Sequence, residues 1–151
     1  MKTSIGPHIG QLAPEIDLPD ERGIRWRLSD LIGKIVVILF YPADETQVCT
    51  QQLCAVRDHW EQYRAAGAVV VGINRQSVEN HQRFASRHSL PLRLLSDAEG
   101  AVVRSYEMNS LMWVKRGVVV VDKEGVIRFR RVVMPFLRPS DEEVLDAIKK
   151  C

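Results

Sequence analysis

The sequence predicts an α/β fold in which a central mixed sheet is flanked by helices and preceded by an N-terminal hairpin. Two continuous apolar, β-branched runs, 35–41 and 68–73, are typical of strands buried on both faces of a sheet. Each is followed by a segment with helical apolar spacing, and such alternation indicates a sheet covered by helices. A later pair of expected strands, 118–122 and 126–132, forms a hairpin across a Lys-Glu-Gly turn and adds an antiparallel edge. With 151 residues, the chain is long enough to form one domain over 1–151.

Apolar spacing and the residues that begin or end helices give the expected elements. In chain order these are a hairpin from 16–18 and 24–26, a strand over 35–41, a helix over 46–66, a strand over 68–73, a helix over 77–88, a strand over 92–95, a helix over 97–107, strands over 118–122 and 126–132, and a helix over 140–150. Pro42 ends the first buried strand, and Gly67 ends the helix that follows. Ser77 and Ser140 are the expected N-caps of two later helices.

Composition and charge favour a soluble globular protein. The apolar fraction of 46% and the charged fraction of 26% are ordinary for that class. A net charge of +2 with no block of Lys or Arg argues against nucleic-acid binding. The longest apolar runs are far shorter than the roughly 18 residues that a membrane span needs. Because the N-terminus also does not resemble a secretory signal, we expect a cytoplasmic protein.

Three cysteines, Cys49, Cys54 and Cys151, are too few for a disulfide scaffold. In a reducing cytoplasm, a close pair such as the first two is typically catalytic, redox-sensing or metal-binding. The four histidines show no ligand-like spacing with each other or with the cysteines, so we expect no metal site. Cys151 is the last residue, and we expect it to be an exposed, frayed thiol.

The segment from Tyr41 to Cys54 carries the predicted chemistry. A buried strand passes into a helix there, so Cys49 falls in the first turn of the helix. Unpaired backbone N–H groups and the positive end of the helix dipole favour an anion at that position, and the thiolate is the reactive form of cysteine. Thr46 can cap the helix and can also direct its hydroxyl at the sulfur or at a bound oxygen. Pro42 can shield the sulfur from water.

This segment resembles the peroxiredoxin signature Pro-x-x-x-Thr-x-x-Cys, which is matched by Pro42, Thr46 and Cys49. The Cys-x-x-x-x-Cys spacing from Cys49 to Cys54 is similar to that of the branch called bacterioferritin comigratory protein or peroxiredoxin Q. The resemblance implies a thioredoxin-like fold with an N-terminal hairpin extension.

The resemblance extends over nearly the whole chain. Residues 10–16 look like the family's Gly-x-x-Ala-Pro opening, and Arg116 ahead of the run 118–121 looks like the strand whose leading arginine meets the active site. Some positions differ, because Gln47-Val48 stands where the family often has Pro-Gly and Tyr106-Glu107-Met108 replaces Tyr-Gly-Val. Neither change removes a catalytic atom.

The resemblance implies a thiol-dependent peroxidase that reduces hydrogen peroxide and organic hydroperoxides. The Cys49 thiolate would attack the peroxide and become a sulfenic acid, while Arg116 stabilises the thiolate and polarises the peroxide. The Thr46 hydroxyl and the Cys49 backbone N–H would orient the two oxygens. Cys54 would then form a disulfide with Cys49, and thioredoxin or glutaredoxin would reduce that disulfide. No bound cofactor is implied, since the sulfur carries both electrons, and the branch is often monomeric, so we expect a monomer.

Helical geometry makes a further demand on this scheme. Five residues along a helix correspond to a rise of about 7.5 Å and a rotation of about 140°, whereas a disulfide needs Cα atoms within roughly 7 Å. Cys49 and Cys54 therefore cannot bond while the helix is intact, and we predict that its first turns unwind in each cycle.

Other interpretations remain open. Cys49 could be a small core residue, Cys54 a bystander, and Arg116 a surface charge. A redox sensor would react once where a peroxidase turns over, and a thiol–disulfide oxidoreductase usually needs Cys-x-x-Cys. Trp113, shortly before Arg116, is expected to pack in the core rather than to line a pocket.

Overall fold

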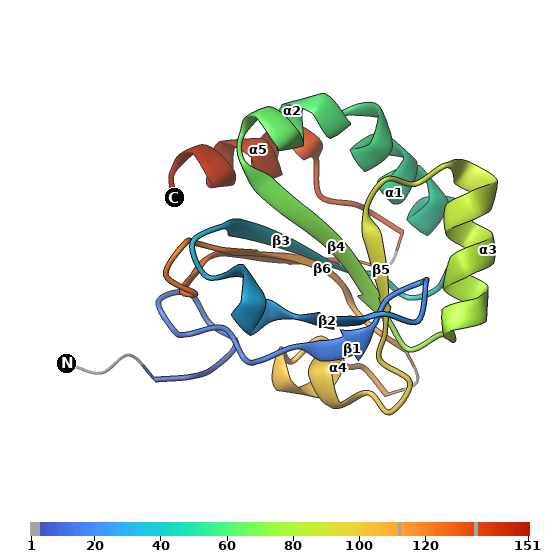
Figure 1. The fold of residues 1–151 in the computed structure, drawn as a ribbon, viewed down its shortest axis with the longest axis horizontal. Coiled ribbons are helices and arrows are strands. Elements are labelled where there is room, and N and C mark those ends of the chain that lie inside the picture. Colours follow the sequence, from blue (N-terminus) through green and yellow to red (C-terminus); the bar gives the residue numbers. More distant parts are fainter. Residues whose placement is uncertain (1–3, 112, 135) are drawn as a thin grey trace.

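The computed structural model describes residues 4–111, 113–134 and 136–151, and its centre is a five-stranded mixed sheet (Figure 1). Along the sheet the strands are β5 (Arg93–Ser96), β4 (Ala68–Asn74), β3 (Ile35–Phe40), β6 (Arg116–Val121) and β7 (Ile127–Val133). The first three run parallel, and β6 and β7 are antiparallel additions. A separate two-stranded hairpin consists of β1 (Asp17–Pro19) and β2 (Arg25–Arg27). The predicted mixed sheet with an N-terminal hairpin is confirmed.

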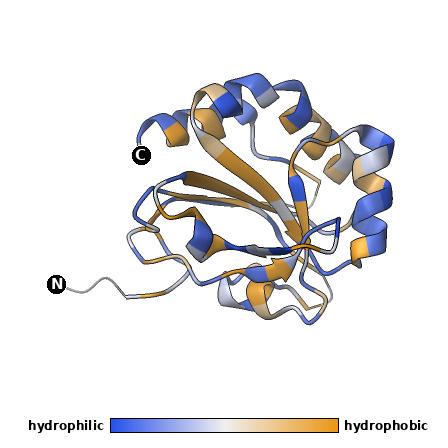
Figure 2. Ribbon diagram, viewed as in Figure 1, coloured by the Kyte–Doolittle hydropathy of each residue, from blue (hydrophilic) through white to orange (hydrophobic). Residues whose placement is uncertain are grey.

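Strand β3 is central because all six of its residues are apolar and buried. Side chains alternate between the two faces of a strand, so β3 contributes to two separate cores. Val37 and Leu39 belong to the cluster on one face, and Val36 and Ile38 belong to the cluster on the other. In Figure 2 the central strands are coloured mainly as hydrophobic, whereas the helices mix hydrophobic and hydrophilic residues.

Helices cover both faces of the sheet, with most of them on one side (Figure 1). They are η1 (Leu28–Leu31), α1 (Gln47–Asp58), α2 (Trp60–Ala65), α3 (Val78–His88), α4 (Ala101–Ser105) and α5 (Asp141–Lys149). Helices α1, α2, α3 and α5 contribute to the first core, whereas α4 and the hairpin region close the second. Within the described ranges, no helix has the length and apolarity to cross a membrane.

Two predicted helices are shorter than expected. The helix expected over 46–66 is interrupted at His59, which has φ −104° and ψ 16° and whose ring Nδ1 lies 2.8 Å from the carbonyl oxygen of Ala55. The His59 backbone N–H still donates to that carbonyl at 3.0 Å, so this helical hydrogen bond is kept and the break lies in the backbone angles of His59. The helical stretch over 97–107 was expected with an early interruption at Gly100; that residue has a left-handed φ of 76°, and the helix covers only Ala101–Ser105 after it.

Candidate active site

The loop between β3 and α1 positions Cys49. Strand β3 ends at Phe40, the loop spans 41–46, and α1 begins at Gln47, so Cys49 is the third helical residue. Its side chain is completely buried and belongs to the core cluster that also contains Leu53 of the same helix. The apolar face of α1 therefore fixes the direction of the sulfur.

Arg116 brings a positive charge to that sulfur. It is the first residue of β6, which pairs with β3 next to the loop through Gly117 and Phe40. The Arg116 side chain is buried, and its Nη2 donates to the Cys49 sulfur at 2.8 Å. A cation at this distance stabilises a sulfur anion. The structure thus joins two predicted site residues that lie far apart in the sequence.

Gln52 is a site residue that the sequence reasoning missed. Arg116 donates through Nη1 to Gln52 Oε1 at 2.6 Å, and the Gln52 side chain is buried. Because Gln52 lies three residues after Cys49, the two side chains share one face of α1. That spacing is the signal that could have identified it. The two Nη atoms of Arg116 therefore contact the Cys49 sulfur and Gln52 of the same helix.

Thr46 occupies the N-cap position of α1, but its side chain makes no capping hydrogen bond. Its hydroxyl instead donates to the carbonyl oxygen of Ala43 at 3.1 Å, and the residue is exposed. The capping role expected from sequence is therefore wrong. The first N–H groups of α1 stay available to an anion, because no side chain at the cap occupies them. Pro42, at the other end of the loop, is half-buried.

The second cysteine, Cys54, is half-buried in the same helix, and all three cysteines are free thiols. Helix α1 is continuous through Cys49 and Cys54, as expected for a form in which they are not bonded. Cys151 is exposed, and partial burial of the thiol together with the nearby Asp122 raises its pKa. In the described part of the chain, no group of three or more His, Cys, Asp or Glu could hold a metal ion.

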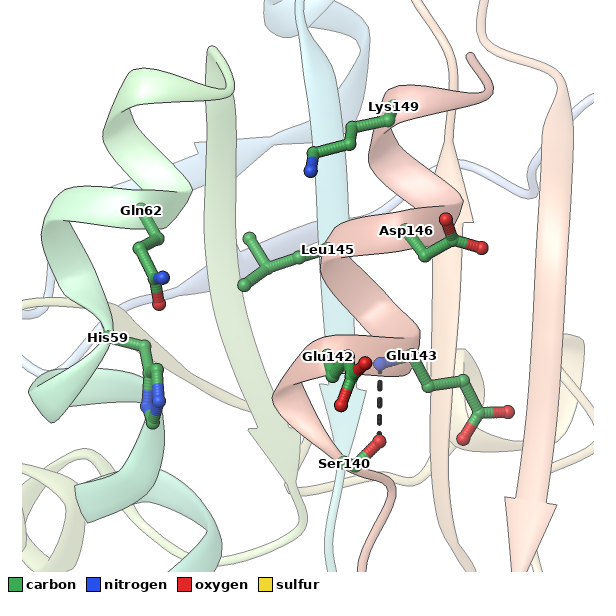
Figure 3. Close-up of a pocket in the computed structure, with 8 residues that line it drawn as sticks. All are labelled: His59, Gln62, Ser140, Glu142, Glu143, Leu145, Asp146 and Lys149. Atoms are coloured by element: carbon green, nitrogen blue, oxygen red, sulfur yellow. Dashed lines mark hydrogen bonds between the residues drawn. The ribbon is translucent and has the colours of Figure 1, made fainter.

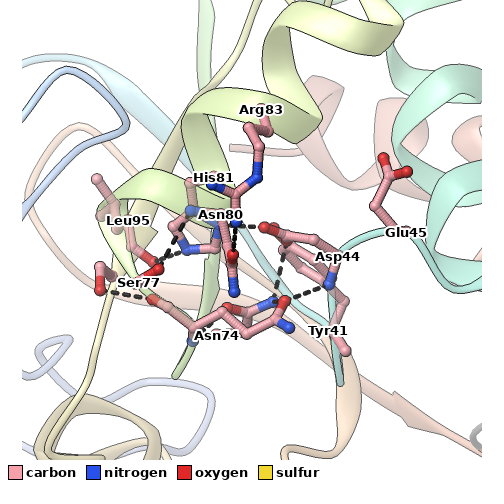
Figure 4. A network of polar contacts seen from close by, with 12 residues as sticks. Tyr41, Asp44, Glu45, Asn74, Ser77, Asn80, His81, Arg83 and Leu95 are labelled. Atoms are coloured by element: carbon pink, nitrogen blue, oxygen red, sulfur yellow. Dashed lines mark hydrogen bonds and ion pairs between the residues drawn. The ribbon is translucent and has the colours of Figure 1, made fainter.

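A buried polar network holds the loop from its other side (Figure 4). Tyr41 donates its hydroxyl to Asp44 Oδ1 at 2.6 Å, and Asn74 donates its side-chain amide to the same oxygen at 3.2 Å. His81 Nδ1 lies 2.6 Å from Asp44 Oδ2. Burial, followed by the charge of Asp44, raises the pKa of Tyr41 well above its ordinary value, so Tyr41 remains a donor. Nothing local in the sequence marks His81, which is brought to the loop by α3.

Two hollows differ in their relation to this site. One of about 450 Å³ opens beside Pro42, and its lining includes Pro42, Ala43, Arg75, Val103, Arg104, Leu111, Trp113 and Val114. Trp113 is 52% exposed and lines this hollow. The expected core packing of this residue, which belongs to the segment before β6, is therefore wrong.

The other hollow, of about 580 Å³, lies between α5 and the segment from His59 to Gln62 (Figure 3). It contains none of the predicted site residues.

Comparison with known sequences agrees with this geometry. The model of the AhpC/TSA family matches residues 9–130. The putative peroxiredoxin bcp of Coxiella burnetii is 39% identical over 127 residues, which are 79% of this chain and 84% of that protein. Peroxiredoxin Bcp of Bacillus subtilis is 36% identical over 125 residues, 78% of this chain and 80% of that protein. The chloroplastic peroxiredoxin Q of Sedum lineare is 43% identical, but the match spans only 66% of its length.

Solved structures show the same architecture. The peroxidoxin BcpB of Mycobacterium tuberculosis superposes with a TM-score of 0.85 at 28% identity, covering 94% of this chain and 96% of that one. The bacterioferritin comigratory protein of Xanthomonas campestris shares the fold, with a TM-score of 0.81 at 23% identity over 89% of this chain and 90% of that one. The chain therefore belongs to the AhpC/TSA family as a peroxiredoxin of the Bcp and peroxiredoxin Q type, a thiol-dependent peroxidase with a thioredoxin-like fold.

Proposed function

We propose that Cys49 reduces hydrogen peroxide and organic hydroperoxides. The observation that carries this proposal is the 2.8 Å contact between Arg116 Nη2 and the Cys49 sulfur in the first turn of an uncapped helix. The thiolate attacks the terminal oxygen of the peroxide, an S–O bond forms, and the O–O bond breaks. The leaving oxygen takes a proton and departs as water or an alcohol, and Cys49 becomes a sulfenic acid.

Each neighbour of Cys49 has a defined task in this step. Arg116 stabilises the thiolate and the charge that develops on the peroxide oxygens, and such preorganised donors are a major source of catalysis. Gln52 holds the guanidinium through its 2.6 Å hydrogen bond. The Thr46 hydroxyl, which now donates to Ala43, turns toward the bound peroxide. Pro42 limits the access of water.

Cys54 resolves the sulfenic acid in the second step. Its thiolate attacks the Cys49 sulfur, an S–S bond forms, and the sulfenic oxygen leaves as water after protonation. Because both residues lie on the continuous helix α1, the first turns of this helix unwind before the bond forms. A dithiol of a reducing cytoplasm, thioredoxin or glutaredoxin, then reduces the disulfide and returns the monomer to its starting state.

The hollow beside Pro42 supports organic hydroperoxides as substrates. Val103, Leu111, Trp113 and Val114 give it an apolar wall, and apolar walls with a few polar groups are typical of sites for small organic molecules. The Xanthomonas campestris relative is itself described by its alkyl peroxide reduction activity.

The test is peroxide consumption with a thioredoxin system by wild type, Cys49→Ser and Cys54→Ser, with Cys151→Ser as the matched control. We expect sustained turnover in wild type and Cys151→Ser, none in Cys49→Ser, and a single turnover in Cys54→Ser. Turnover by Cys49→Ser would contradict the proposal. If wild type consumes only one equivalent with both thioredoxin and glutaredoxin systems, the protein is a peroxide sensor instead.

A further inference from the structure

We propose that Asp44 and His81 form a buried pair that shares one proton, and that this pair positions Cys49 by fixing the loop in front of α1. The proposal rests on the function proposed for Cys49. It assigns Asp44 and His81 as positioning residues, because neither contacts the sulfur in the structure.

The proton follows from the partners of the two ring nitrogens of His81, which is completely buried. Nε2 lies 3.0 Å from the carbonyl oxygen of Leu95, and a carbonyl only accepts, so Nε2 carries a hydrogen. Nδ1 lies 2.6 Å from Asp44 Oδ2. Two facing lone pairs at that distance would repel each other, so a proton lies between these atoms. Whether it sits on Nδ1 or on Oδ2, the pair as a whole is neutral.

The other donors around Asp44 agree with this assignment. The Tyr41 hydroxyl and the Asn74 amide both donate to Oδ1, which leaves Oδ2 to His81 alone. All four side chains are buried. A buried acceptor that loses its donor is left unsatisfied, which is unfavourable in such surroundings, so the set acts as a unit. Figure 4 shows these side chains converging on Asp44 from the end of β3, from β4 and from α3.

Asp44 lies within the loop that carries the signature residues Pro42 and Thr46. Its side chain is held as described, and its backbone N–H donates to Gln76 Oε1 at 2.5 Å. Both parts of Asp44 are thus fixed to the carboxyl end of β4 and to α3. Thr46, two residues later, makes no capping bond to α1. Asp44 is therefore the last residue before Cys49 whose buried side chain is fixed to other elements, since the Glu45 side chain that contacts α3 is exposed.

Tyr41 connects the pair to the reactive sulfur. It belongs to the same buried cluster as Cys49, and the charge of Cys49 contributes to the raised pKa of Tyr41 after burial and the effects of Asp44. A displaced Asp44 therefore moves the loop that precedes Cys49 and disturbs a neighbour of the sulfur. Two consequences follow: Cys49 fits less well against Arg116, and α1 unwinds more readily.

The experiment compares His81→Asn and Asp44→Asn with wild type by rapid kinetics. Separate rate constants are measured for oxidation of Cys49 by hydrogen peroxide and for closure of the Cys49–Cys54 disulfide. We expect oxidation to slow about tenfold or more, since small misplacements of reacting groups have large effects, and disulfide closure to become faster. Tyr41→Phe, which removes one donor and keeps the ring, should shift both rates in the same directions by less.

Two controls separate positioning from general destabilisation. His8→Asn and Asp58→Asn make the same chemical changes at exposed sites and should leave both rates unchanged. Ile127→Ala truncates the core on the opposite face of the sheet and should not change the two rates in opposite directions. If the two main variants match wild type, or match Ile127→Ala, the positioning role is overturned. If they do not fold, Tyr41→Phe decides the question.

Nuclear magnetic resonance of 15N-histidine protein tests the proton independently of catalysis. We expect a hydrogen on Nε2 of His81 and a strongly downfield proton shared between Nδ1 and Asp44 Oδ2 that disappears in Asp44→Asn. An Nδ1 that carries an unshared lone pair in wild type would overturn the shared proton. If wild type consumes no peroxide, the proposed function fails, and this spectrum still decides on the pair.

Discussion

In the described part of the chain, three helices follow a hydroxyl residue, yet α1 begins differently from α3 and α5. Ser77 accepts a hydrogen bond from the Asn80 backbone N–H at 3.1 Å, and Ser140 accepts one from the Glu143 N–H at 3.2 Å. Both helices also carry acidic residues in their first turns. Helix α1 has neither a side-chain cap nor an acidic first turn. The positive end of its dipole is thus left for an anion, and local contacts do little to stabilise its first turn.

Glu45, the residue before the N-cap of α1, is a further difference between this helix and the other two. Glu45 has a left-handed φ of 65°, a conformation that is unfavourable for residues other than glycine. Its carboxylate lies 2.9 Å from Arg87 Nη1 on α3. The start of α1 is therefore held by contacts with distant elements, whereas α3 and α5 are held by residues within their own first turns. The start of α1 can therefore be released only when these contacts with α3 and β6 are broken.

Removing Arg116 should have the largest effect, because its guanidinium contacts both the Cys49 sulfur and Gln52 of α1. We expect Arg116→Met to slow oxidation of Cys49 by about 100-fold or more, the size seen when a preorganised donor is lost. Stopped-flow fluorescence with hydrogen peroxide measures the rate. Arg128→Met, at an exposed position of β7, is the control. A loss below about threefold would show that Arg116 does not act on the sulfur.

Truncating the three hydroxyl residues tests the comparison directly. Ser77→Ala and Ser140→Ala should each lower the free energy of unfolding by about 1 kcal/mol, the usual value of an N-cap. Thr46→Ala should change it by less than about 0.5 kcal/mol, as for a surface substitution, while slowing peroxide reduction. Chemical denaturation measures the stabilities. Equal losses at all three positions would contradict the difference between the helices.

We expect the smallest effect, on stability, at Asp122. Its carboxylate, like the serine caps, is held by contacts with residues close in the sequence. Burial acts to raise the pKa of Asp122, but hydrogen bonds from Arg128 and from the backbone of Val126 and Glu124 outweigh it and lower the pKa below 3.8. This contribution to stability is present above pH 3.8 and is lost as the pH falls through the lowered value. Asp122→Asn should therefore reduce stability at pH 7 by at most about 1 kcal/mol.

Denaturation of Asp122→Asn and wild type at a series of pH values checks this expectation. The two curves should converge in acid, where the wild-type carboxylate is protonated. Glu99→Gln, at an exposed position, should follow wild type throughout. A difference that stays constant down to acid pH would show that the charge of Asp122 contributes nothing.

Most of the fold could be predicted because the central strands β3, β4 and β6 are nearly continuous apolar runs. The alternation of Val36 and Val37 between two cores follows from the period of a strand, whatever the rest of the chain does. The break at His59 could not be predicted, since apolar spacing continues across it. The missing cap at Thr46 could not be predicted either. It depends on the orientation of the side chain, whose hydroxyl donates to the Ala43 carbonyl and does not accept from the helix.

The sequence by itself determined that Pro42, Thr46 and Cys49 share one loop and one helical turn, because they lie within eight residues of each other. Only the tertiary structure decided which distant residues lie beside this loop and turn. Arg116 is 67 residues from Cys49, and the register of β6 against β3 brings them together. His81 is 37 residues from Asp44 and meets it where α3 packs beside the loop. Local spacing fixes which residues share a turn, but the Arg116 charge at the sulfur and the His81 contact with Asp44 depend on sheet register and helix packing.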